Sequence, residues 1–244
     1  MSEPESLRQR WESEAENWVR WARKPGHDSY WRYHREAFFS LVPEPGRLTL
    51  DIGCGEGRVA RDLKAQGHRV IAADASATMV RYATEADPSM EVHVSDAAHL
   101  PFADGIADLV ISFMSLQDTD DMAGAVFEAA RVLMSDGRYC IAVVHPINSA
   151  GSFVGGSEGS PFVIQGDYFT RRRYSDRLER DGLGLTIHSA HRPLQDYARA
   201  LEDAKFVIEA IRESTVTEEA ARERAASARW RRVPLFLDLR ARKR

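Results

Sequence analysis

The sequence has little cysteine and no long apolar run, and each absence excludes a class of protein. Only two cysteines occur, Cys54 and Cys140, and their spacing fits neither a disulfide framework nor a cluster of metal ligands. No apolar stretch approaches the roughly 18 residues that a membrane-spanning helix needs. The first residues are polar and acidic and lack the basic and apolar regions of a signal peptide. We therefore expect a protein of the reducing cytoplasm that does not cross a membrane.

An excess of positive charge is also missing. Lys and Arg number 33 and Asp and Glu number 37, so the net charge is −4. Because phosphate binding needs basic surface, this composition argues against a nucleic-acid partner. Hydrophobic residues make up 43% and charged residues 29% of the 244 residues, which is typical of a globular chain that folds without a disulfide or a metal. We expect one domain over residues 1–244, as a monomer or a homodimer.

Aromatic residues are concentrated in residues 1–45, which hold four of the five tryptophans. Three of these are spaced by 7 and 3 residues, which places them on one face of a helix: Trp11, Trp18 and Trp21. Proline and glycine at 25–26 break this helix, and a second is expected over residues 29–41. Two interpretations of this helical arm remain open, as core filling or as a lid over a ligand. Tyr30 is then a candidate for substrate contact.

Residues 46–145 alternate between short apolar runs and helical segments. The runs predict five strands, at residues 48–52, 70–74, 92–95, 108–113 and 138–144. Helices are predicted between them at residues 57–66, 77–86 and 122–134. Strands separated by helices indicate crossover connections and a parallel sheet. The strand residues are continuously apolar rather than alternating, which is typical of strands buried on both faces.

The pattern changes after residue 145. Residues 146–192 form a predicted cap insertion, in which the Gly- and Ser-rich segment 148–160 should be mobile. Two strands at 167–174 and 183–188, joined by a charged loop, predict a hairpin. Residues 193–244 complete the domain with a helix at 194–204 and strands at 207–211 and 234–239.

The most informative motif is LDIGCGEG at residues 50–57, where a predicted strand turns into a helix. Glycines there permit a tight turn and a close approach of backbone to ligand. Ligands of an open parallel sheet bind beyond the carboxyl ends of its strands. The spacing is G-x-G-x-G, and Arg58 stands where the dinucleotide pattern G-x-G-x-x-G has its last glycine. This difference argues against the alternative of a nicotinamide-dependent oxidoreductase, which a binding titration with a nicotinamide cofactor would test.

Three acidic residues follow or end adjacent predicted strands: Asp51, Asp74 and Asp96. An acid at the end of the second strand can accept hydrogen bonds from ribose hydroxyls. Asp96, after the third strand, can accept one from the amino group of an adenine. Because the glycine turn itself has no basic residue, the set suits a nucleoside that carries positive charge and no phosphates.

Taken in order, these motifs resemble the class I S-adenosylmethionine-dependent methyltransferases, and most closely the small-molecule group often labelled type 11. The resemblance covers residues 48–144 and rests on residues 51–57, 74–76, 96–97, 100–102, 131–133 and 136–137. It implies a Rossmann-like α/β fold with a mostly parallel seven-stranded sheet, helices on both faces and an antiparallel last strand. Ser135-Asp136-Gly137 replaces the usual Pro-Gly-Gly, a change of turn that leaves the cofactor interpretation intact.

The resemblance also implies a cofactor, S-adenosylmethionine, with S-adenosylhomocysteine as product, and a set of residues that bind it. The glycines would line its methionine part, Asp74 would hold the ribose, and Asp96 would contact the adenine rim. The full predicted set is Asp51, Gly53, Cys54, Gly55, Gly57, Asp74, Ala75, Ser76, Met79, Asp96, Ala97 and Met114. Asp51 either braces the turn or contacts the ligand. Cys54 is interpreted as a small buried residue, since nothing near it in sequence supplies a base for a nucleophile.

The substrate side rests on fewer residues. His145 follows the fifth predicted strand, at the edge of the sheet where the cofactor would lie. The usual pKa of histidine, near 6.5, suits a general base. We predict that His145 contacts the substrate and acts as that base, and the alternative is a structural role. Gln117 stands where related enzymes often carry a histidine and would hydrogen-bond cofactor or substrate. His188 and His191 lack further ligands at suitable spacing, so no metal site is predicted. His191 either links the hairpin to the next helix or faces the substrate.

The predicted function is transfer of a methyl group from S-adenosylmethionine to an O, N or C atom of a small molecule. One alternative is an RNA-modifying methyltransferase, against which the acidic charge argues and which the salt dependence of RNA binding would test. Another is a non-catalytic or repurposed S-adenosylmethionine-binding protein, because cofactor motifs do not report turnover.

Overall fold

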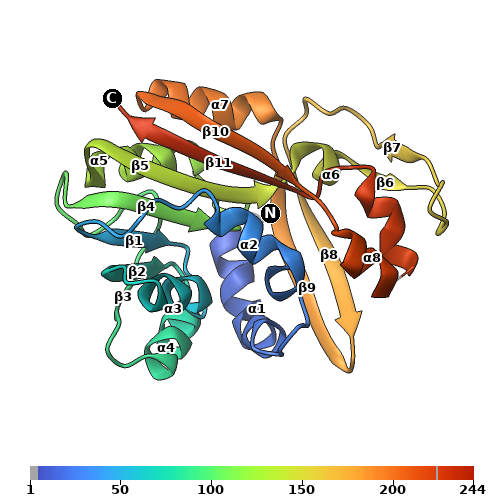
Figure 1. Ribbon diagram of the computed structural model, residues 1–244, viewed down its shortest axis with the longest axis horizontal. Helices are drawn as coiled ribbons and strands as arrows, with labels where there is room; N and C mark the ends of the chain where they lie inside the picture. Colours follow the sequence, from blue (N-terminus) through green and yellow to red (C-terminus); the bar gives the residue numbers. More distant parts are fainter. Residues whose placement is uncertain (1–4, 224) are drawn as a thin grey trace.

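The computed structural model describes residues 5–223 and 225–244, in which a seven-stranded sheet carries helices on both faces (Figure 1). Its strands are β1 (Thr49–Ile52), β2 (Val70–Asp74), β3 (Glu91–Val94), β4 (Ala107–Phe113), β5 (Leu133–Val144), β10 (Phe206–Ser214) and β11 (Phe236–Lys243). Their order across the sheet is β10-β11-β5-β4-β1-β2-β3. The pairs from β3 to β5 are parallel, and β11 is antiparallel to both β5 and β10. The predicted sheet with an antiparallel last strand is confirmed.

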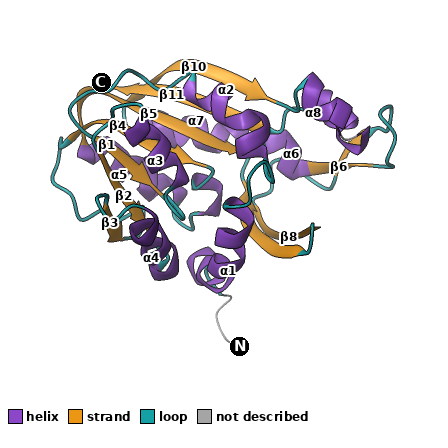
Figure 2. Ribbon diagram, turned by 60° about the horizontal axis from the view of Figure 1, so that its bottom comes forward, coloured by secondary structure: helices purple, strands orange, loops and turns teal. Residues whose placement is uncertain are grey.

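The two faces of the sheet bury different clusters because successive strand residues point to opposite sides. On β5, Tyr139 and Ile141 pack in one cluster with α5 (Met122–Val132) and α7 (Leu194–Asp203), whereas Cys140 belongs to the other. That second cluster includes residues of α3 (Arg58–Ala65), α4 (Ala77–Ala86) and the segment before β1. Figure 2 shows the helices on both sides of the strands.

Most predicted bounds of the core elements agree with the structure within a few residues, and β2 and α4 agree fully. The helix predicted over 122–134 ends earlier, at Val132, and β5 begins directly at Leu133. Leu133 is fully buried and pairs with Ala107 of β4, so tertiary contact places it in the sheet.

The N-terminal arm begins with α1 (Leu7–Ala22), which Ser6 and Gln9 start with a reciprocal capping box. The second predicted helix is divided into a π-helical turn, Tyr30–His34, and a short α2 (Arg35–Phe39). Helix α1 packs against α4 through Ala15, Val19 and Met79. In Figure 1, α1 lies beside strand β9 of the insertion.

The insertion contains α6 (Pro146–Ala150), the hairpin of β6 (Gly151–Phe153) and β7 (Phe162–Ile164), and the hairpin of β8 (Arg172–Arg180) and β9 (Leu183–His191). The predicted hairpin is present as β8 and β9, but its first strand lies at 172–180 rather than 167–174. A two-residue turn with positive φ, Asp181-Gly182, pairs Arg180 with Leu183 and sets this register. Charged residues predicted for the loop are therefore in the strand. The mobility of residues 148–160 stays a prediction.

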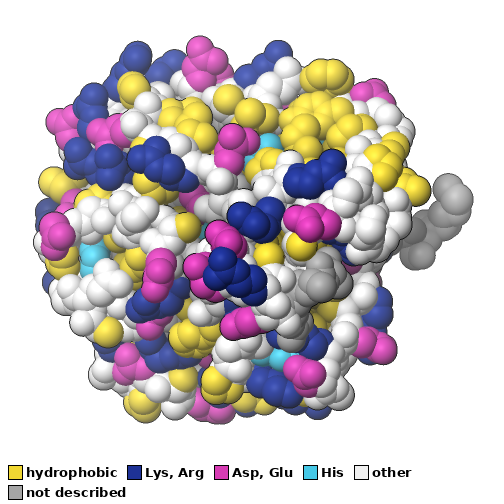
Figure 3. Space-filling view, turned by 45° about the vertical axis from the view of Figure 1, so that its right-hand side comes forward, with side chains coloured by type: hydrophobic (Ala, Val, Ile, Leu, Met, Phe, Trp, Pro, Cys, Tyr) yellow, Lys and Arg dark blue, Asp and Glu magenta, His cyan; other side chains and the backbone are white. Residues whose placement is uncertain are grey.

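The helix α8 (Glu218–Glu223) and the 3₁₀ turn Ala225–Arg231 lie beside the first hairpin of the insertion. Trp230 of this turn contacts Phe153 and Phe162 edge to face, with ring centroids 4.9 and 6.3 Å away. Figure 3 looks toward this end of the molecule, where hydrophobic side chains gather on the upper part of the surface.

Candidate active site

A cavity of about 210 Å³ opens where the carboxyl ends of β1, β2 and β4 meet the N-terminal arm and strand β9. The glycine turn after β1 forms its floor, and α1 contributes Trp11 and Trp18. Strand β9 contributes Ile187 and Ser189. The cavity therefore lies at the edge of the sheet where the sequence places a ligand.

The glycine turn has a conformation that residues with side chains rarely adopt. Gly53, Gly55 and Gly57 have φ values of +73°, +56° and +82°. A Cβ atom at Gly53 would lie 2.4 Å from the Cβ of Ser115, and one at Gly55 3.4 Å from the Nε1 of Trp18. Two of the glycines line the cavity, whereas Gly57 faces the packing of α3 and α4, and a Cβ there would meet Ala83 at 3.1 Å.

Asp74 joins this turn to the end of β2. Its Oδ2 accepts a hydrogen bond from the Gly55 amide at 2.8 Å, and its Oδ1 accepts one from the Ser76 amide at 2.9 Å. Burial raises the pKa of Asp74, and these amide donors act in the opposite direction. Each carboxylate oxygen still has a further lone pair for a ligand in the cavity.

All but two of the residues predicted to bind the cofactor line the cavity: Gly53, Cys54, Gly55, Asp74, Ala75, Ser76, Met79, Asp96, Ala97 and Met114. Asp96 is at the β3 side, where its Oδ1 accepts from the Ala98 amide at 2.9 Å. Burial raises the pKa of the Cys54 thiol well above its usual value, as expected for an unreactive buried cysteine.

Gly57 and Asp51 are the two exceptions. Asp51 lies below the turn, outside the cavity lining, and the Ala60 amide of α3 donates to its carboxyl group. Its Oδ2 is buried without a hydrogen-bond partner. Burial, together with the charge of Asp74, raises the pKa of Asp51 to about 7. Of the two roles considered for Asp51, this geometry fits bracing of the turn.

On the substrate side, the structure places Gln117 in the lining but not Tyr30, His145 or His191. Tyr30 is fully buried, packs edge to face on Phe113, and donates a hydrogen bond to Asp62 at 2.6 Å. It belongs to the core below α2, because its large ring fills space between the arm and the sheet. This corrects its assignment to the substrate site.

His145 is engaged away from the cavity. Its Nδ1 accepts from the Ile147 amide at 3.1 Å and so caps α6, and its Nε2 lies 3.0 Å from Glu213. The residue is 4% exposed, and burial lowers the pKa of its imidazole. Both ring nitrogens are occupied by structural contacts, so the geometry contradicts its prediction as substrate contact and general base.

His191 is likewise occupied at both ring nitrogens. Its Nδ1 lies 2.7 Å from Ser149 Oγ and its Nε2 2.8 Å from the carbonyl oxygen of Tyr168. It joins β9 to α6 and to the loop before β8, which fits the linking role and corrects the alternative of substrate contact. Within residues 5–223 and 225–244, no group of three or more His, Cys, Asp or Glu side chains is placed to hold a metal.

Several lining residues were not predicted from the sequence: Trp11, Trp18, Asp118, Asp120, Ile187 and Ser189. The aromatic helical arm of residues 1–45 left two interpretations open, core filling or a lid over a ligand, so the sequence indicated the two tryptophans as one of two possibilities. The two aspartates follow β4 in a segment with several acids, and nothing in that pattern marks them. Ile187 and Ser189 reach the cavity only because β9 packs against α1.

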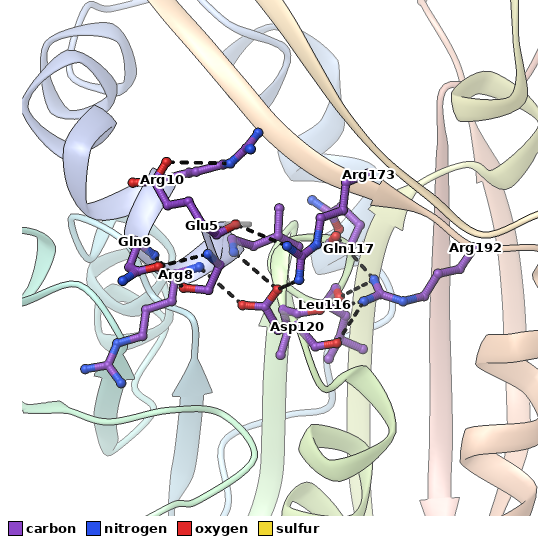
Figure 4. A network of polar contacts seen from close by, with 12 residues as sticks. Glu5, Arg8, Gln9, Arg10, Leu116, Gln117, Asp120, Arg173 and Arg192 are labelled. Atoms are coloured by element: carbon purple, nitrogen blue, oxygen red, sulfur yellow. Dashed lines mark hydrogen bonds and ion pairs between the residues drawn. The ribbon is translucent and has the colours of Figure 1, made fainter. Parts of the chain in front are cut away.

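Figure 4 shows how the loop after β4 holds the arm. The carboxylate of Asp120 accepts hydrogen bonds from the amides of Leu7 and Arg8, at 3.2 and 3.5 Å, at the start of α1. Arg173 of β8 donates to the same carboxylate at 2.6 Å. A carboxylate at a helix N-terminus is favourable because it meets unpaired amides and the positive end of the helix dipole.

Arg192 supports this loop from the other side. Its guanidinium donates to the carbonyl oxygens of Leu116, Gln117, Thr119 and Asp120, at 2.6 to 3.4 Å. The side chain is largely buried, and Figure 4 shows it approaching the loop from the right. The loop that carries Gln117 and Asp118 into the cavity is therefore fixed by backbone contacts.

Comparisons with known proteins concern the part of the chain that carries the glycine turn. Residues 50–141 match a family model described as a methyltransferase domain. A probable S-adenosylmethionine-dependent methyltransferase of Mycobacterium tuberculosis is 35% identical over 112 residues, covering 45% of this chain and 41% of that protein. A demethylmenaquinone methyltransferase of Beutenbergia cavernae is 32% identical over 117 residues, covering 48% of each. The matched part thus spans less than half the length of these curated relatives.

A crystal structure of an S-adenosylmethionine-dependent methyltransferase from Mesorhizobium loti superposes with a TM-score of 0.72 at 24% identity, covering 88% of this chain and 98% of that one. This likeness concerns the fold. Residues 50–141 are thus similar in sequence to a methyltransferase domain, and the chain shares the fold of this solved structure. Within the described residues, no helix combines the length and the apolar composition that crossing a bilayer would require.

Proposed function

We propose that the chain transfers a methyl group from S-adenosylmethionine to a small-molecule acceptor. The observation that carries the proposal is the glycine turn joined to Asp74 at the edge of a cavity that is lined by further acids. Gly53 and Gly55 of this turn line the cavity. No Lys or Arg lies within residues 51–57 to offset a phosphate group.

The residues present suit this cofactor. Asp74, at the end of β2, has lone pairs available for the hydroxyls of a ribose, and Asp96 lies at the β3 side of the same cavity. Apolar side chains of Met79 and Ala97 line that side and suit an adenine ring. Gly53 and Met114, at the ends of β1 and β4, would hold the methionine part.

When bound, the cofactor supplies an electrophilic methyl carbon on a sulfonium. The protein then has to hold the acceptor in line with that carbon and to exclude water. Trp11 and Trp18 of the arm and Ile187 of β9 give the cavity apolar walls opposite the glycine turn. We assign no general base to His145, because both of its ring nitrogens bind structural partners.

The small-molecule acceptor is supported by the name of a relative and by the charge of the chain. The Beutenbergia cavernae relative acts on demethylmenaquinone, according to its name. The net charge of −4 argues against an RNA substrate.

Calorimetry with S-adenosylmethionine, S-adenosylhomocysteine and NAD tests the cofactor assignment. We expect both sulfur compounds to bind and NAD to give no heat of binding. Binding of NAD alone would overturn the proposal. A screen of small acceptors with isotopically labelled S-adenosylmethionine then tests turnover, and cofactor binding with no transfer to any acceptor would favour a non-catalytic binder.

A further inference from the structure

One wall of the cavity presents hydrogen-bond acceptors that the protein does not fully use. It consists of Asp118 and Gln117, in the 3₁₀ turn Leu116–Asp118 that follows β4. Both residues line the cavity, and both lie on the loop that Arg192 holds through its backbone.

Asp118 is half-buried and is held by two neighbours. Ser189 Oγ of β9 donates to its Oδ1 at 2.5 Å, and Gln117 Nε2 approaches its Oδ2 at 3.3 Å. The second contact is long, so Oδ2 keeps most of its capacity to accept from a ligand. Desolvation raises the pKa of Asp118 to about 8, while Ser189 and the nearby Arg192 act in the opposite direction. The carboxylate form, which accepts a hydrogen bond or a proton from a ligand, therefore predominates above that pH, and the binding experiments below are done there.

Gln117 adds a second acceptor beside this carboxylate. Its Nε2 donates to the carbonyl oxygen of Met114 at 2.7 Å, which fixes the orientation of the amide. Its Oε1 is buried without a hydrogen-bond partner, and the side chain is only 4% exposed. A buried acceptor left without a donor costs free energy, so a ligand that supplies a donor here gains binding energy.

Three of the arginines near this wall bind other groups of the protein. No ion pair joins Asp118 to a Lys or Arg in the described part of the chain. Arg192 donates to backbone carbonyls, Arg173 binds Asp120, and Arg58 binds Asp28 at 2.6 Å. Arg8 also lines the cavity, and Figure 4 shows its side chain pointing away from Gln117 and Asp120. This wall therefore favours a ligand with a donor over an anionic one.

We propose that Asp118 and Gln117 recognise the methyl acceptor through an N–H or O–H group, so that the substrate is an amine or an alcohol with an apolar body. This rests on the proposed methyl transfer. The lone pair of the acceptor nitrogen or oxygen forms the bond to the methyl carbon while the carbon–sulfur bond breaks and its electrons remain on sulfur. The proton of the acceptor passes to the carboxylate of Asp118 and then to solvent. Trp11 and Ile187 contact the apolar body.

Binding of two cofactor analogues tests the position of Asp118 without a known substrate. S-adenosylhomocysteine lacks the methyl group, and sinefungin carries an amine on a carbon that replaces the methylated sulfur. We expect Asp118→Asn to bind S-adenosylhomocysteine within about twofold of the wild type and sinefungin about tenfold more weakly. Asp176→Asn, an exposed change on β8, is the matched control. Ser189→Ala keeps the carboxylate and should retain most of the sinefungin affinity.

The outcomes separate the two proposals. Failure of the wild type to bind S-adenosylhomocysteine contradicts the proposed function. Equal weakening of both analogues by Asp118→Asn assigns Asp118 to the cofactor, and an unchanged sinefungin affinity shows that the carboxylate does not face a donor; either result overturns the inference. A melting curve of each variant identifies loss of folding. If Asp118→Asn does not fold, the analogue affinities of Ser189→Ala and Gln117→Leu test the inference instead. We expect Gln117→Leu to weaken the binding of sinefungin and to leave that of S-adenosylhomocysteine unchanged.

Matched probes distinguish the two donors. With S-adenosylhomocysteine present, 2-phenylethylamine, 2-phenylethanol and phenylacetate are titrated into the protein and followed by tryptophan fluorescence. We expect the amine or the alcohol to bind more tightly than the carboxylate, and the tighter of the two to identify the donor. Equal or tighter binding of phenylacetate, or no binding of either donor, contradicts the inference.

Discussion

The indole Nε1 of Trp11 donates a hydrogen bond to the carbonyl oxygen of His188 at 2.8 Å. The contact joins α1 to β9, which are far apart in the sequence, and Glu14 adds a second link by accepting from the Thr186 amide at 3.2 Å. Trp11 and the β9 residues beside His188 line the same cavity. The N-terminal arm and the insertion thus form one wall of the site together.

Because Trp11 and Trp18 line the cavity with their rings 5.9 Å apart, ligand binding should alter tryptophan fluorescence. We expect S-adenosylhomocysteine to change the emission of the wild type, and Trp11→Phe with Trp18→Phe to remove most of that change. Trp230→Phe serves as the control, since Trp230 packs on Phe153 and Phe162 outside the cavity lining. A loss of signal in the control variant alone would place the ligand elsewhere.

Asp120 should hold the arm closed. Asp120→Ala removes the acceptor for the Leu7 and Arg8 amides and the partner of Arg173, contacts worth about 0.5–2 kcal/mol at a helix start. We expect limited proteolysis within residues 8–23 to become several-fold faster, and S-adenosylhomocysteine to slow it. The control is Asp136→Ala, whose partner Arg242 lies on the surface far from the arm. Equal cleavage rates in both variants would mean that Asp120 does not retain α1.

The part of the cavity lining around the glycine turn could be predicted from the sequence because its residues lie at strand ends that local patterns locate. Gly53 and Asp96 follow predicted strands and Asp74 ends one, and parallel pairing brings those ends together. The opposite part of the lining could not be predicted. The ring chemistry of His145 and His191 favours a role at the site, but a residue distant in sequence occupies at least one ring nitrogen of each, Glu213 for His145 and Tyr168 for His191. Asp118 was missed because only the packing of β9 gives it Ser189 as a partner.

The glycine turn offers a matched pair of substitutions. Gly53 and Gly26 both have positive φ, so alanine at either position costs about 1–2 kcal/mol in backbone strain. At Gly26 the added Cβ meets nothing within 4 Å, whereas at Gly53 it lies 2.4 Å from Ser115 Cβ. Urea unfolding should therefore show a loss at least about 1 kcal/mol larger for Gly53→Ala. Adding Ser115→Gly should recover part of that difference, and equal losses in the two single variants would contradict the crowding.

Asp74→Ala should weaken S-adenosylhomocysteine binding by about 1–3 kcal/mol, roughly 5- to 150-fold, since it removes charged acceptors for the ligand. It also releases the amides of Gly55 and Ser76, so the melting temperature should fall as well. Calorimetry with Asp203→Ala as an exposed control measures the effect. An affinity equal to that of the wild type would mean that Asp74 only braces the turn.

Asp51 should make the stability of the ligand-free protein depend on pH. Burial and the charge of Asp74 raise its pKa to about 7, against about 3.9 in an unfolded chain. The folded state therefore binds a proton that the unfolded state releases, and this stabilisation is complete below about pH 4 and is lost as pH rises through about 7.

Asp51→Asn removes the ionisation and keeps an acceptor for the Ala60 amide, so its effect should differ between pH 5 and pH 8. At pH 8 the wild type carries an unpaired buried charge, and the variant should gain up to a few kcal/mol relative to it. At pH 5 the wild-type carboxyl is protonated, and the advantage should be small. Melting temperatures at the two pH values, with Asp203→Asn as the exposed control, measure this. The difference in melting temperature between Asp51→Asn and the wild type could instead stay constant from pH 5 to pH 8. That result would mean that Asp51 does not titrate in this range and that a contact other than the Ala60 amide stabilises its carboxylate.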